Sequence, residues 1–267
     1  MSKKLLGSME LNRIYQIDCI EGMKFIPEKS VKLVIADPPY NIDIAEWDTW
    51  DNAKNYLEWC KKWVSEIARV MSDDACGFVW CSQTFMADIE MILREHFVIQ
   101  NRIIWSYDNG QRMATKKLSM GYEPLFCFSK GKNFTFNLDE MRDGVIWEGK
   151  RTKKHKNGHV TVTTPHPLGR RPLDVWNVAR LTGGAKNGHP SPKPEKLVDR
   201  LIRGYSNEED IVLDPFMGSG TTAIMAKHNK RYFIGFEKEH KYIELANQRL
   251  ESTYNEKGDI EIIQKEN

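Results

Sequence analysis

A rigid turn with reactive side chains follows the first continuous apolar segment of the chain. Residues 31–36 are almost entirely apolar, and Asp37-Pro38-Pro39-Tyr40 comes directly after them. Two adjacent prolines remove two backbone donors and fix two φ angles, so a strand does not continue through them. The turn therefore holds a carboxylate and an aromatic ring just beyond a strand end, which is typical of a binding or catalytic site.

A second loop with the features of a ligand site lies at residues 212–224, which read VLDPFMGSGTTAI. A buried strand is predicted to end at Asp214, and a helix to begin just after Gly218 and Gly220. Glycines allow close backbone approach and a helix start offers free N–H groups, so the loop suits a nucleotide-like ligand. No lysine follows the glycines, which argues against a P-loop, and the dinucleotide fingerprint lacks its third glycine. Glu237 is the last residue of the next predicted strand. It is either an acid that binds ribose hydroxyls or an exposed acid at a strand end.

The elements around these loops alternate between strands and helices. Continuous apolar strands and helices with an apolar stripe predict an α/β fold with a doubly wound, mostly parallel sheet. The predicted strands cover residues 13–18, 31–36, 75–82, 99–107, 123–137, 210–216 and 231–237, of which 123–137 forms a hairpin turning at Lys130-Gly131. The predicted helices cover residues 53–71, 85–93, 195–205, 219–229 and 240–252. Ligands bind outside the carboxyl ends of such strands, so the two loops are expected to face each other.

Length and composition limit the class of protein. With 267 residues, 40% hydrophobic and 28% charged, the chain is expected to form one elaborated α/β domain or two small ones. No apolar run is long enough to span a membrane and the first residues lack a signal-peptide core, so we expect a cytoplasmic protein without a membrane partner. The five cysteines include no C-x-x-C pair, so we expect reduced thiols and no metal site.

The charge distribution predicts a polyanionic partner. Nine basic residues between Lys150 and Lys186 stand against a single acid, Asp174, so this segment carries +8 and the remaining chain −6 of the total +2. The basic segment interrupts the alternation of strands and helices. We therefore expect it to contact nucleic acid.

Together these features resemble the β-class DNA amino-methyltransferases of restriction–modification systems. In that family a D-P-P-Y motif comes first, a target-recognition segment follows, and an F-x-G-x-G cofactor motif comes near the C-terminus. The resemblance covers residues 12–250, with one departure at Ser191-Pro192, where the family commonly has Thr-Gln. It implies a methyltransferase fold with circularly permuted motifs, formed by residues 1–149 and 187–267, with 150–186 inserted as a basic target-recognition segment.

The same resemblance implies a reaction: transfer of the methyl group of S-adenosylmethionine to the N6 amino group of an adenine flipped out of duplex DNA. The catalytic residues would be Asp37, Pro38, Pro39 and Tyr40, with the Asp37 carboxylate and the Pro38 carbonyl accepting the two amine N–H groups and Tyr40 stacking on the base. Those expected to bind the cofactor are Asp18, Asp37, His189, Ser191, Lys193, Asp214, Phe216, Gly218, Ser219, Gly220, Thr221 and Glu237. Those expected to contact DNA are Arg112, Lys116, Lys117, Arg170, Arg171 and Arg180. For Asp18, a cap at a strand end is a nearly equal alternative. For the 106–120 stretch, which contains Arg112, Lys116 and Lys117, a solvent-exposed loop is an equal alternative.

Several alternatives stay open at this point. Methylation of cytosine N4 uses the same chemistry, although Ser more often replaces Asp37 in those enzymes. A protein glutamine methyltransferase typically has Asn at that position and the cofactor loop first in the chain. A catalytically silent DNA-binding protein and an NAD-dependent oxidoreductase are the remaining alternatives. A cognate restriction endonuclease and a second copy of the chain are further partners that the resemblance suggests.

Overall fold

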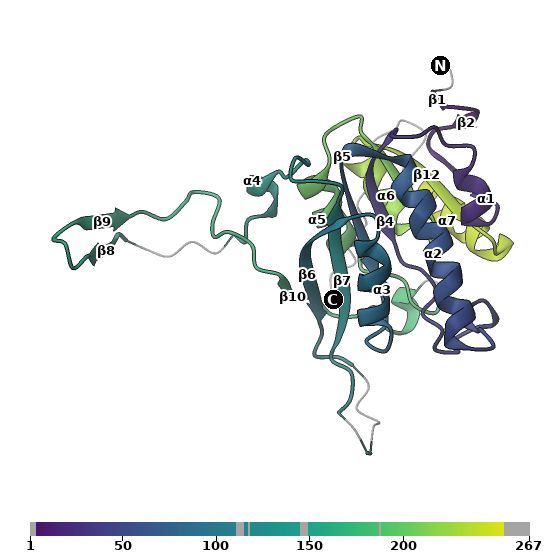
Figure 1. Ribbon diagram of the computed structural model, residues 1–267, viewed down its shortest axis with the longest axis horizontal. Helices are drawn as coiled ribbons and strands as arrows, with labels where there is room; N and C mark the ends of the chain where they lie inside the picture. Colours follow the sequence, from purple (N-terminus) through teal and green to yellow (C-terminus); the bar gives the residue numbers. More distant parts are fainter. Residues whose placement is uncertain (1–3, 111–114, 117, 145–148, 187, 254–267) are drawn as a thin grey trace.

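The computed structural model describes residues 4–110, 115–116, 118–144, 149–186 and 188–253. Its centre is an eight-stranded sheet with the strand order β10-β6-β7-β5-β4-β11-β12-β3 (Figure 1). In that order the strands are Val175–Asn177, Val98–Ser106, Tyr122–Ser129, Met71–Trp80, Val31–Ala36, Ile211–Asp214, Tyr232–Glu237 and Arg13–Gln16. Neighbours are parallel except for β7, which is antiparallel to both β5 and β6. The predicted mostly parallel sheet is confirmed.

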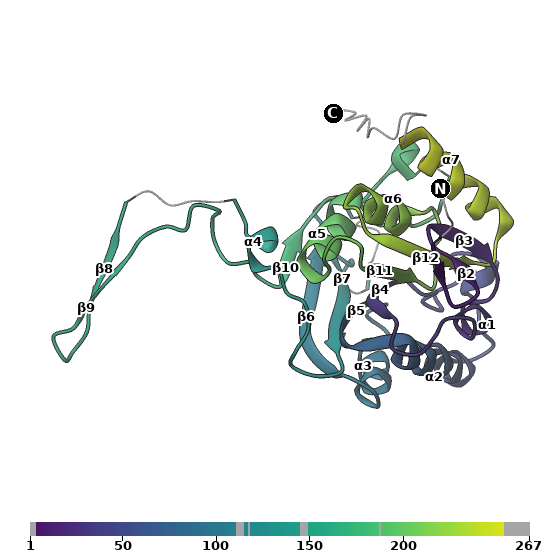
Figure 2. The same cartoon turned by 90° about the horizontal axis from the view of Figure 1, so that it is seen from above.

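Helices cover both faces of the sheet, as Figure 2 shows. One face carries α1 (Cys19–Met23), α2 (Ala53–Val70) and α3 (Met86–Arg94); the other carries α5 (Glu195–Tyr205), α6 (Thr221–His228) and α7 (His240–Thr253). Each face has its own apolar core. Side chains of β4 alternate between the two, with Val34 in one core and Leu33 and Ile35 in the other. A strand buried on both faces explains its continuous apolar sequence. The doubly wound arrangement is therefore confirmed.

The strand predicted for the second half of residues 123–137 is wrong. β7 ends at Ser129, and it lies between β5 and β6, so it has no free edge for a hairpin partner. Instead, Phe134 and Phe136 pack on Tyr205 at the end of α5, with ring centroids 6.4 and 5.2 Å away. The alternating aromatics thus face a helix rather than a neighbouring strand.

A long ribbon leaves the body of the protein beside α4 (Leu138–Met141) and extends away from it (Figures 1 and 2). Its distal part is an antiparallel pair, β8 (Arg151–Lys154) and β9 (Val160–Thr163). The ribbon, which we call the arm (residues 142–170), closes at its base where the backbones of Asp143 and Arg170 form two hydrogen bonds. After the arm the chain returns to the main sheet as β10.

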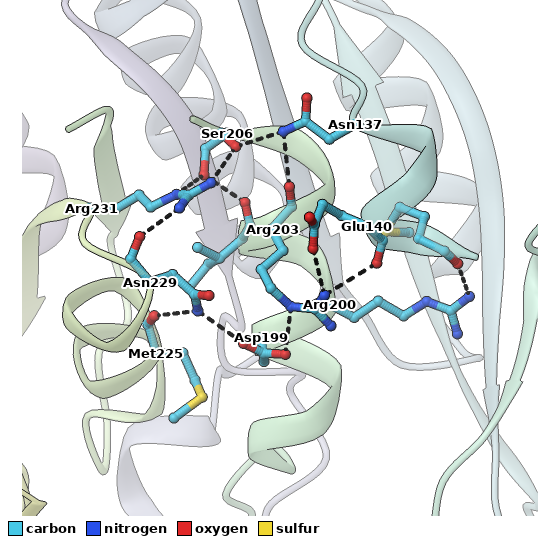
Figure 3. Close-up of polar contacts among 11 residues, drawn as sticks. Asn137, Glu140, Asp199, Arg200, Arg203, Ser206, Met225, Asn229 and Arg231 are labelled. Atoms are coloured by element: carbon cyan, nitrogen blue, oxygen red, sulfur yellow. Dashed lines mark hydrogen bonds and ion pairs between the residues drawn. The ribbon is translucent and has the colours of Figure 1, made fainter. Parts of the chain in front are cut away.

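Arginines of α5 fix the base of the arm to the body, as Figure 3 shows. Arg203 pairs with the Glu140 carboxylate at 2.7 Å. Arg200 donates to the Met141 carbonyl at 2.9 Å and to the Asp143 carboxylate at 3.0 Å. These contacts hold the base of the arm against α5. Within the described part of the chain, none of the helices has the length and apolar character to cross a bilayer.

Candidate active site

A cavity of about 730 Å³ opens at the carboxyl ends of β4 and β11. Its walls include the turn Asp37–Tyr40 and the loop 214–219. β4 and β11 are parallel neighbours, with Leu33 opposite Val212, and the chain order reverses direction between them. Such a switch point brings two strand ends together at one crevice. The two motifs therefore share one cavity, as the predicted topology requires.

The turn Asp37–Tyr40, the proposed catalytic turn, is held in place by Asp48, whose side chain is fully buried. Its carboxylate accepts hydrogen bonds from the backbone N–H groups of Tyr40, Asn41, Ile42 and Ile44. A neighbouring contact adds to this, because the Tyr56 hydroxyl donates to the Pro39 carbonyl at 3.0 Å. Sequence reasoning missed Asp48, since an acid in a polar loop is usually solvated. The available signal was that a chain leaving a strand needs acceptors for its N–H groups.

The carboxylate of Asp37 has a neighbour on each oxygen. The Tyr40 hydroxyl donates to Oδ1 at 2.7 Å, and Lys193 Nζ lies 2.7 Å from Oδ2. Lys193 is only 6% exposed and also pairs with Glu123 at 3.3 Å. Burial alone would lower the pKa of Lys193, but Asp37 and Glu123 outweigh it and raise that pKa, so the amine is charged. The sequence pointed to Lys193 as a cofactor ligand and gave no sign of Glu123, which belongs to no motif.

The glycine loop needs its glycines at two positions. Gly218 has φ +50° and Gly220 has φ +82°, a region that side-chain-bearing residues rarely adopt. A Cβ on Gly220 would also lie 2.7 Å from the Cβ of Ala246. α6 begins at Thr221, as predicted, and that side chain is buried. The backbone can therefore approach a ligand closely at the start of this helix.

Two acids flank the glycine loop. Asp214 is 5% exposed, and burial raises its pKa to about 7 even though its carboxylate accepts from the Phe216 N–H at 2.9 Å. Glu237 accepts from the Gly218 N–H at 2.9 Å, and its other oxygen accepts from the backbone of Lys238 and Glu239. Burial raises the pKa of Glu237 as well. Glu237 is therefore not an exposed strand-end acid, because its carboxylate bonds the backbone of the glycine loop. Its binding to ribose hydroxyls stays a prediction.

His189 lies against the glycine loop, because a Cβ on Gly218 would be 3.0 Å from its Nε2. Burial lowers the pKa of His189 to about 4, and nearby Lys193, Arg249 and Lys241 add to the effect. The ring is therefore neutral at pH 7. Its Nδ1 accepts from the Ser191 N–H at 3.3 Å, so the proton resides on Nε2, which is a donor facing the loop.

Further residues shape the part of the cavity near the glycine loop. The ring of Phe216 packs between Trp59 and Trp63, with centroids 5.7 and 5.5 Å away. Asp18 lines the cavity and also caps α1 by accepting from the Ile20 N–H at 2.9 Å, so both predicted roles have a place. Trp59, a partly buried residue of α2, also lines the cavity, and it was not predicted because it belongs to neither motif.

Arg249 of α7 is a support that the motifs do not reveal. It donates to the carbonyl and hydroxyl of Ser219, reaches the Thr221 hydroxyl at 3.4 Å, and pairs with Glu195 at 2.8 Å. These contacts join α7 and α5 to the glycine loop. An arginine near the end of an amphipathic helix carries no sequence signal for such a role.

The residues predicted to contact DNA occupy different places. Arg180 lines the cavity; its backbone exchanges two 2.9 Å hydrogen bonds with the Asn109 side chain, and its guanidinium lies 5.0 Å from the Tyr107 ring centroid. Arg170 and Arg171 lie at the base of the arm. Lys116 is exposed between β6 and β7. Arg112 and Lys117 lie outside the described residues.

The five cysteines are all buried free thiols. Among residues 4–253, apart from the gaps given above, no three His, Cys, Asp or Glu side chains are grouped as a metal site.

Comparison with known proteins agrees with this geometry. Residues 31–248 match the N6/N4 DNA methylase family. The chain is 36% identical over 254 residues to the Type II methyltransferase M1.MboII of Moraxella bovis. The matched region covers 90% of this chain and 96% of that relative. It is 34% identical over 253 residues to the DNA adenine methyltransferase YhdJ of Escherichia coli strain K12, covering 91% of this chain and 83% of that protein.

Solved structures give the same result. The crystal structure of the M1.HpyAVI–S-adenosylmethionine complex superposes with a TM-score of 0.61 at 27% identity, covering 89% of this chain and 98% of that one. The cytosine-N4-specific PvuII DNA methyltransferase has a TM-score of 0.70 at 17% identity, covering 91% and 88%, which shows the fold alone. The chain belongs to the N6/N4 DNA methylase family and is a DNA methyltransferase. This finding sets aside the oxidoreductase and the protein methyltransferase alternatives.

Proposed function

We propose that the chain transfers a methyl group from S-adenosylmethionine to the N6 amino group of an adenine flipped out of duplex DNA. The observation that carries this proposal is that the Asp37–Tyr40 turn and the glycine loop line one cavity in a chain of the DNA methylase family. Two facts favour adenine over cytosine. The motif has Asp rather than Ser at position 37, and a relative at 34% identity is named a DNA adenine methyltransferase.

The residues around the glycine loop fit the chemical groups of the methyl donor. S-adenosylmethionine supplies an electrophilic methyl group on a positively charged sulfur. Asp214, a buried carboxylate with a raised pKa, would accept from the ammonium of the amino acid part. His189 would donate a hydrogen bond from its Nε2–H to the carboxylate of the amino acid part of the cofactor, with Ser191 as a neighbouring polar group. Glu237 would accept from ribose hydroxyls, and Phe216 would pack against the adenosine.

The catalytic turn would act on the target amine. The lone pair of an exocyclic amine is delocalised into the ring, which makes the nitrogen a poor nucleophile. If the Asp37 carboxylate and the Pro38 carbonyl accept its two N–H groups, the lone pair is directed away from the ring. Tyr40, whose hydroxyl bonds Asp37, would stack on the flipped base. Most of the acceleration would then come from positioning and from negative charge beside a nitrogen that becomes positive.

DNA contact would combine the cavity rim with the arm. Arg180 is placed at the cavity, where a guanidinium can reach a base edge or a phosphate near the flipped nucleotide. Strand β8 of the arm carries Arg151, Lys153 and Lys154 on exposed positions, which suits phosphate contact. We therefore propose residues 150–186 as the target-recognition segment. Its affinity for DNA should be sensitive to salt.

We further place the chain in a restriction–modification system. M1.MboII, a relative at 36% identity over most of both chains, is named a Type II methyltransferase. On this basis a cognate restriction endonuclease is the expected functional counterpart. A homodimer is a second proposal, to be tested by the mass of the protein in solution with and without DNA.

Incubation with S-adenosylmethionine and unmethylated genomic DNA, followed by digestion to nucleosides, tests the proposed reaction. We expect N6-methyladenine from the wild type and none from Asp37→Ala. If N4-methylcytosine is found instead, the proposed active site stands and the proposed target base is wrong. Absence of any methylated base, with the cofactor bound, would contradict the proposal and support a silent DNA-binding protein.

A further inference from the structure

Glu123 lies in the cavity although neither motif contains it. It stands near the start of β7, and its side chain is 15% exposed. Its Oε2 lies 3.3 Å from Lys193 Nζ and 3.4 Å from the Tyr40 hydroxyl. Lys193 in turn lies 2.7 Å from Asp37. One buried ammonium is therefore shared by two carboxylates, one of which belongs to the catalytic turn.

The charges of this cluster sum to −1. Lys193 is cationic, for the reason given above, and the rings of Tyr40, Trp80 and Trp105 lie 5.4–5.9 Å from its Nζ. Tyr40 is a neutral phenol, because burial and then the two nearby carboxylates raise its pKa. Two carboxylates against one ammonium leave one negative charge in a largely buried place, where charges interact strongly.

We propose that Glu123 is a positioning residue for methyl transfer, which engages Lys193 so that the Asp37 carboxylate keeps net negative charge for the target amine. This inference rests on the proposed function. Without Glu123, Lys193 would pair with Asp37 alone, and the pair would be neutral. The ammonium has three N–H groups, so the two carboxylates leave one for a further acceptor, including the cofactor carboxylate predicted for Lys193.

The charge balance of the transfer shows why a net negative cluster helps. The lone pair of the amine nitrogen forms the new N–C bond while the C–S bond breaks and its electron pair goes to sulfur. The positive charge moves from sulfur to nitrogen, and the nitrogen later loses one proton to water. Asp37 is proposed to bond that nitrogen, so its uncompensated charge stabilises the charge that develops there.

Glu123→Gln tests this inference because it keeps the size of the side chain and one accepting oxygen but removes the charge. With saturating cofactor and DNA, we expect the single-turnover methylation rate to fall by roughly 10- to 100-fold, less than the roughly 100- to 1,000-fold loss of a group that acts directly on the reacting atoms. Glu90→Gln is the matched control. Glu90 is also 15% exposed and also ion-paired, in its case with Arg94 and Arg102, but it lies outside the cavity. Its rate should match that of the wild type.

A second readout needs no DNA. S-adenosylhomocysteine lacks the methyl group and the positive charge on sulfur. Wild type should therefore bind S-adenosylmethionine more tightly, relative to S-adenosylhomocysteine, than Glu123→Gln does. We expect this ratio of affinities to fall by roughly threefold in Glu123→Gln, as expected for partly screened charges. Glu123→Asp, which restores the charge on a shorter side chain, should be faster than Glu123→Gln, and this order decides the matter if Glu123→Gln folds poorly.

The outcomes separate the inference from the function on which it rests. A Glu123→Gln variant with the wild-type rate, or a rate order with Gln equal to or above Asp, would overturn the role of Glu123. An equal loss of affinity for both cofactor forms would assign Glu123 to shaping the cavity instead. A wild-type protein that methylates no DNA would overturn the proposed function, and the affinity ratio would still decide the role of Glu123.

Discussion

Asp48 offers a quantitative test of how the catalytic turn is held. Its buried carboxylate accepts from four backbone N–H groups, at 2.9 Å from Asn41, 3.0 Å from Ile42 and 3.3 Å from Ile44, in addition to Tyr40. In Asp48→Asn, Oδ1 keeps its two acceptor contacts with Tyr40 and Asn41. The new amide group then faces the N–H groups of Ile42 and Ile44, donor against donor.

The magnitude follows from the two lost contacts. A hydrogen bond to a charged group contributes about 1.5–3 kcal/mol, so two of them amount to about 3 kcal/mol at the lower bound. If this cost falls on the ordering of the loop, the competent arrangement loses about 100-fold in population, since 1.4 kcal/mol is about tenfold. We expect kcat/KM for methylation of DNA to fall by about that factor in Asp48→Asn. Asp48→Ala, which loses all four contacts, should fall further.

The assay combines methylation kinetics with binding of the cofactor. All four contacts of Asp48 go to residues 40–44 rather than to the glycine loop, so the Kd for S-adenosylmethionine should change little. Asn52→Ala is a matched control, because Asn52 caps α2 beyond the loop by accepting from the Asn55 N–H. Wild-type kinetics in Asp48→Ala would refute the reasoning, and so would an equal loss in Asn52→Ala.

Three further perturbations probe the glycine loop, Asp214 and the predicted DNA-contact residue Arg180. Gly220→Ala should lower the free energy of unfolding by about 1–3 kcal/mol, because alanine is strained at φ +82° and its Cβ would crowd Ala246; thermal unfolding measures this, and an unchanged Tm would contradict it. The affinity for S-adenosylmethionine should rise as pH increases through about 7, since Asp214 is protonated below that pH and cannot pair with a cation. Calorimetry from pH 6 to 8 measures this affinity. The Asp214→Asn variant should show a flat pH profile, and an unchanged profile would contradict the prediction. The raised pKa of Asp214 also affects stability. Between pH 4 and 7 the folded protein keeps a proton on Asp214 that the unfolded chain releases, so the contribution of Asp214 to the free energy of unfolding should be lost as pH rises from about 4 to about 7. Arg180→Ala should weaken DNA binding and reduce the salt slope by about one if it contacts phosphate; titrations at several salt concentrations test this, and an unchanged affinity and slope would remove Arg180 from the interface.

Local sequence predicted the framework because each element has a physical signature. The continuous apolar run of β4 indicates a strand buried on both faces, and the stripe of α2 indicates a helix covering one face. The two loops were recognisable because prolines and glycines restrict or free the backbone at fixed positions. Parallel topology then brings the ends of β4 and β11 together, which is how two distant motifs predicted one cavity.

Side chains that act through tertiary contact left no such signature. Glu123 reaches the cavity from β7, and Arg249 reaches the glycine loop from α7. The local sequences of both elements indicate only ordinary packing. Asp48 looks like a solvated acid until the loop is seen to fold around it. The predicted hairpin at Lys130-Gly131 failed for a related reason, because the pairing of β7 with both neighbours depends on the whole sheet. Long-range arrangement, rather than local propensity, decides these features.

The charge of Asp37 is central to this account, and one comparison tests it most directly. The single-turnover rate of DNA methylation should be measured for wild type and Asp37→Asn at saturating cofactor and DNA, together with the Kd for S-adenosylmethionine in both. We predict a rate loss of about 100- to 1,000-fold, the effect of removing one preorganised electrostatic group, with a much smaller change in cofactor affinity. A wild-type rate at saturation, with the loss confined to cofactor affinity, would contradict a role for the Asp37 carboxylate in the transfer step.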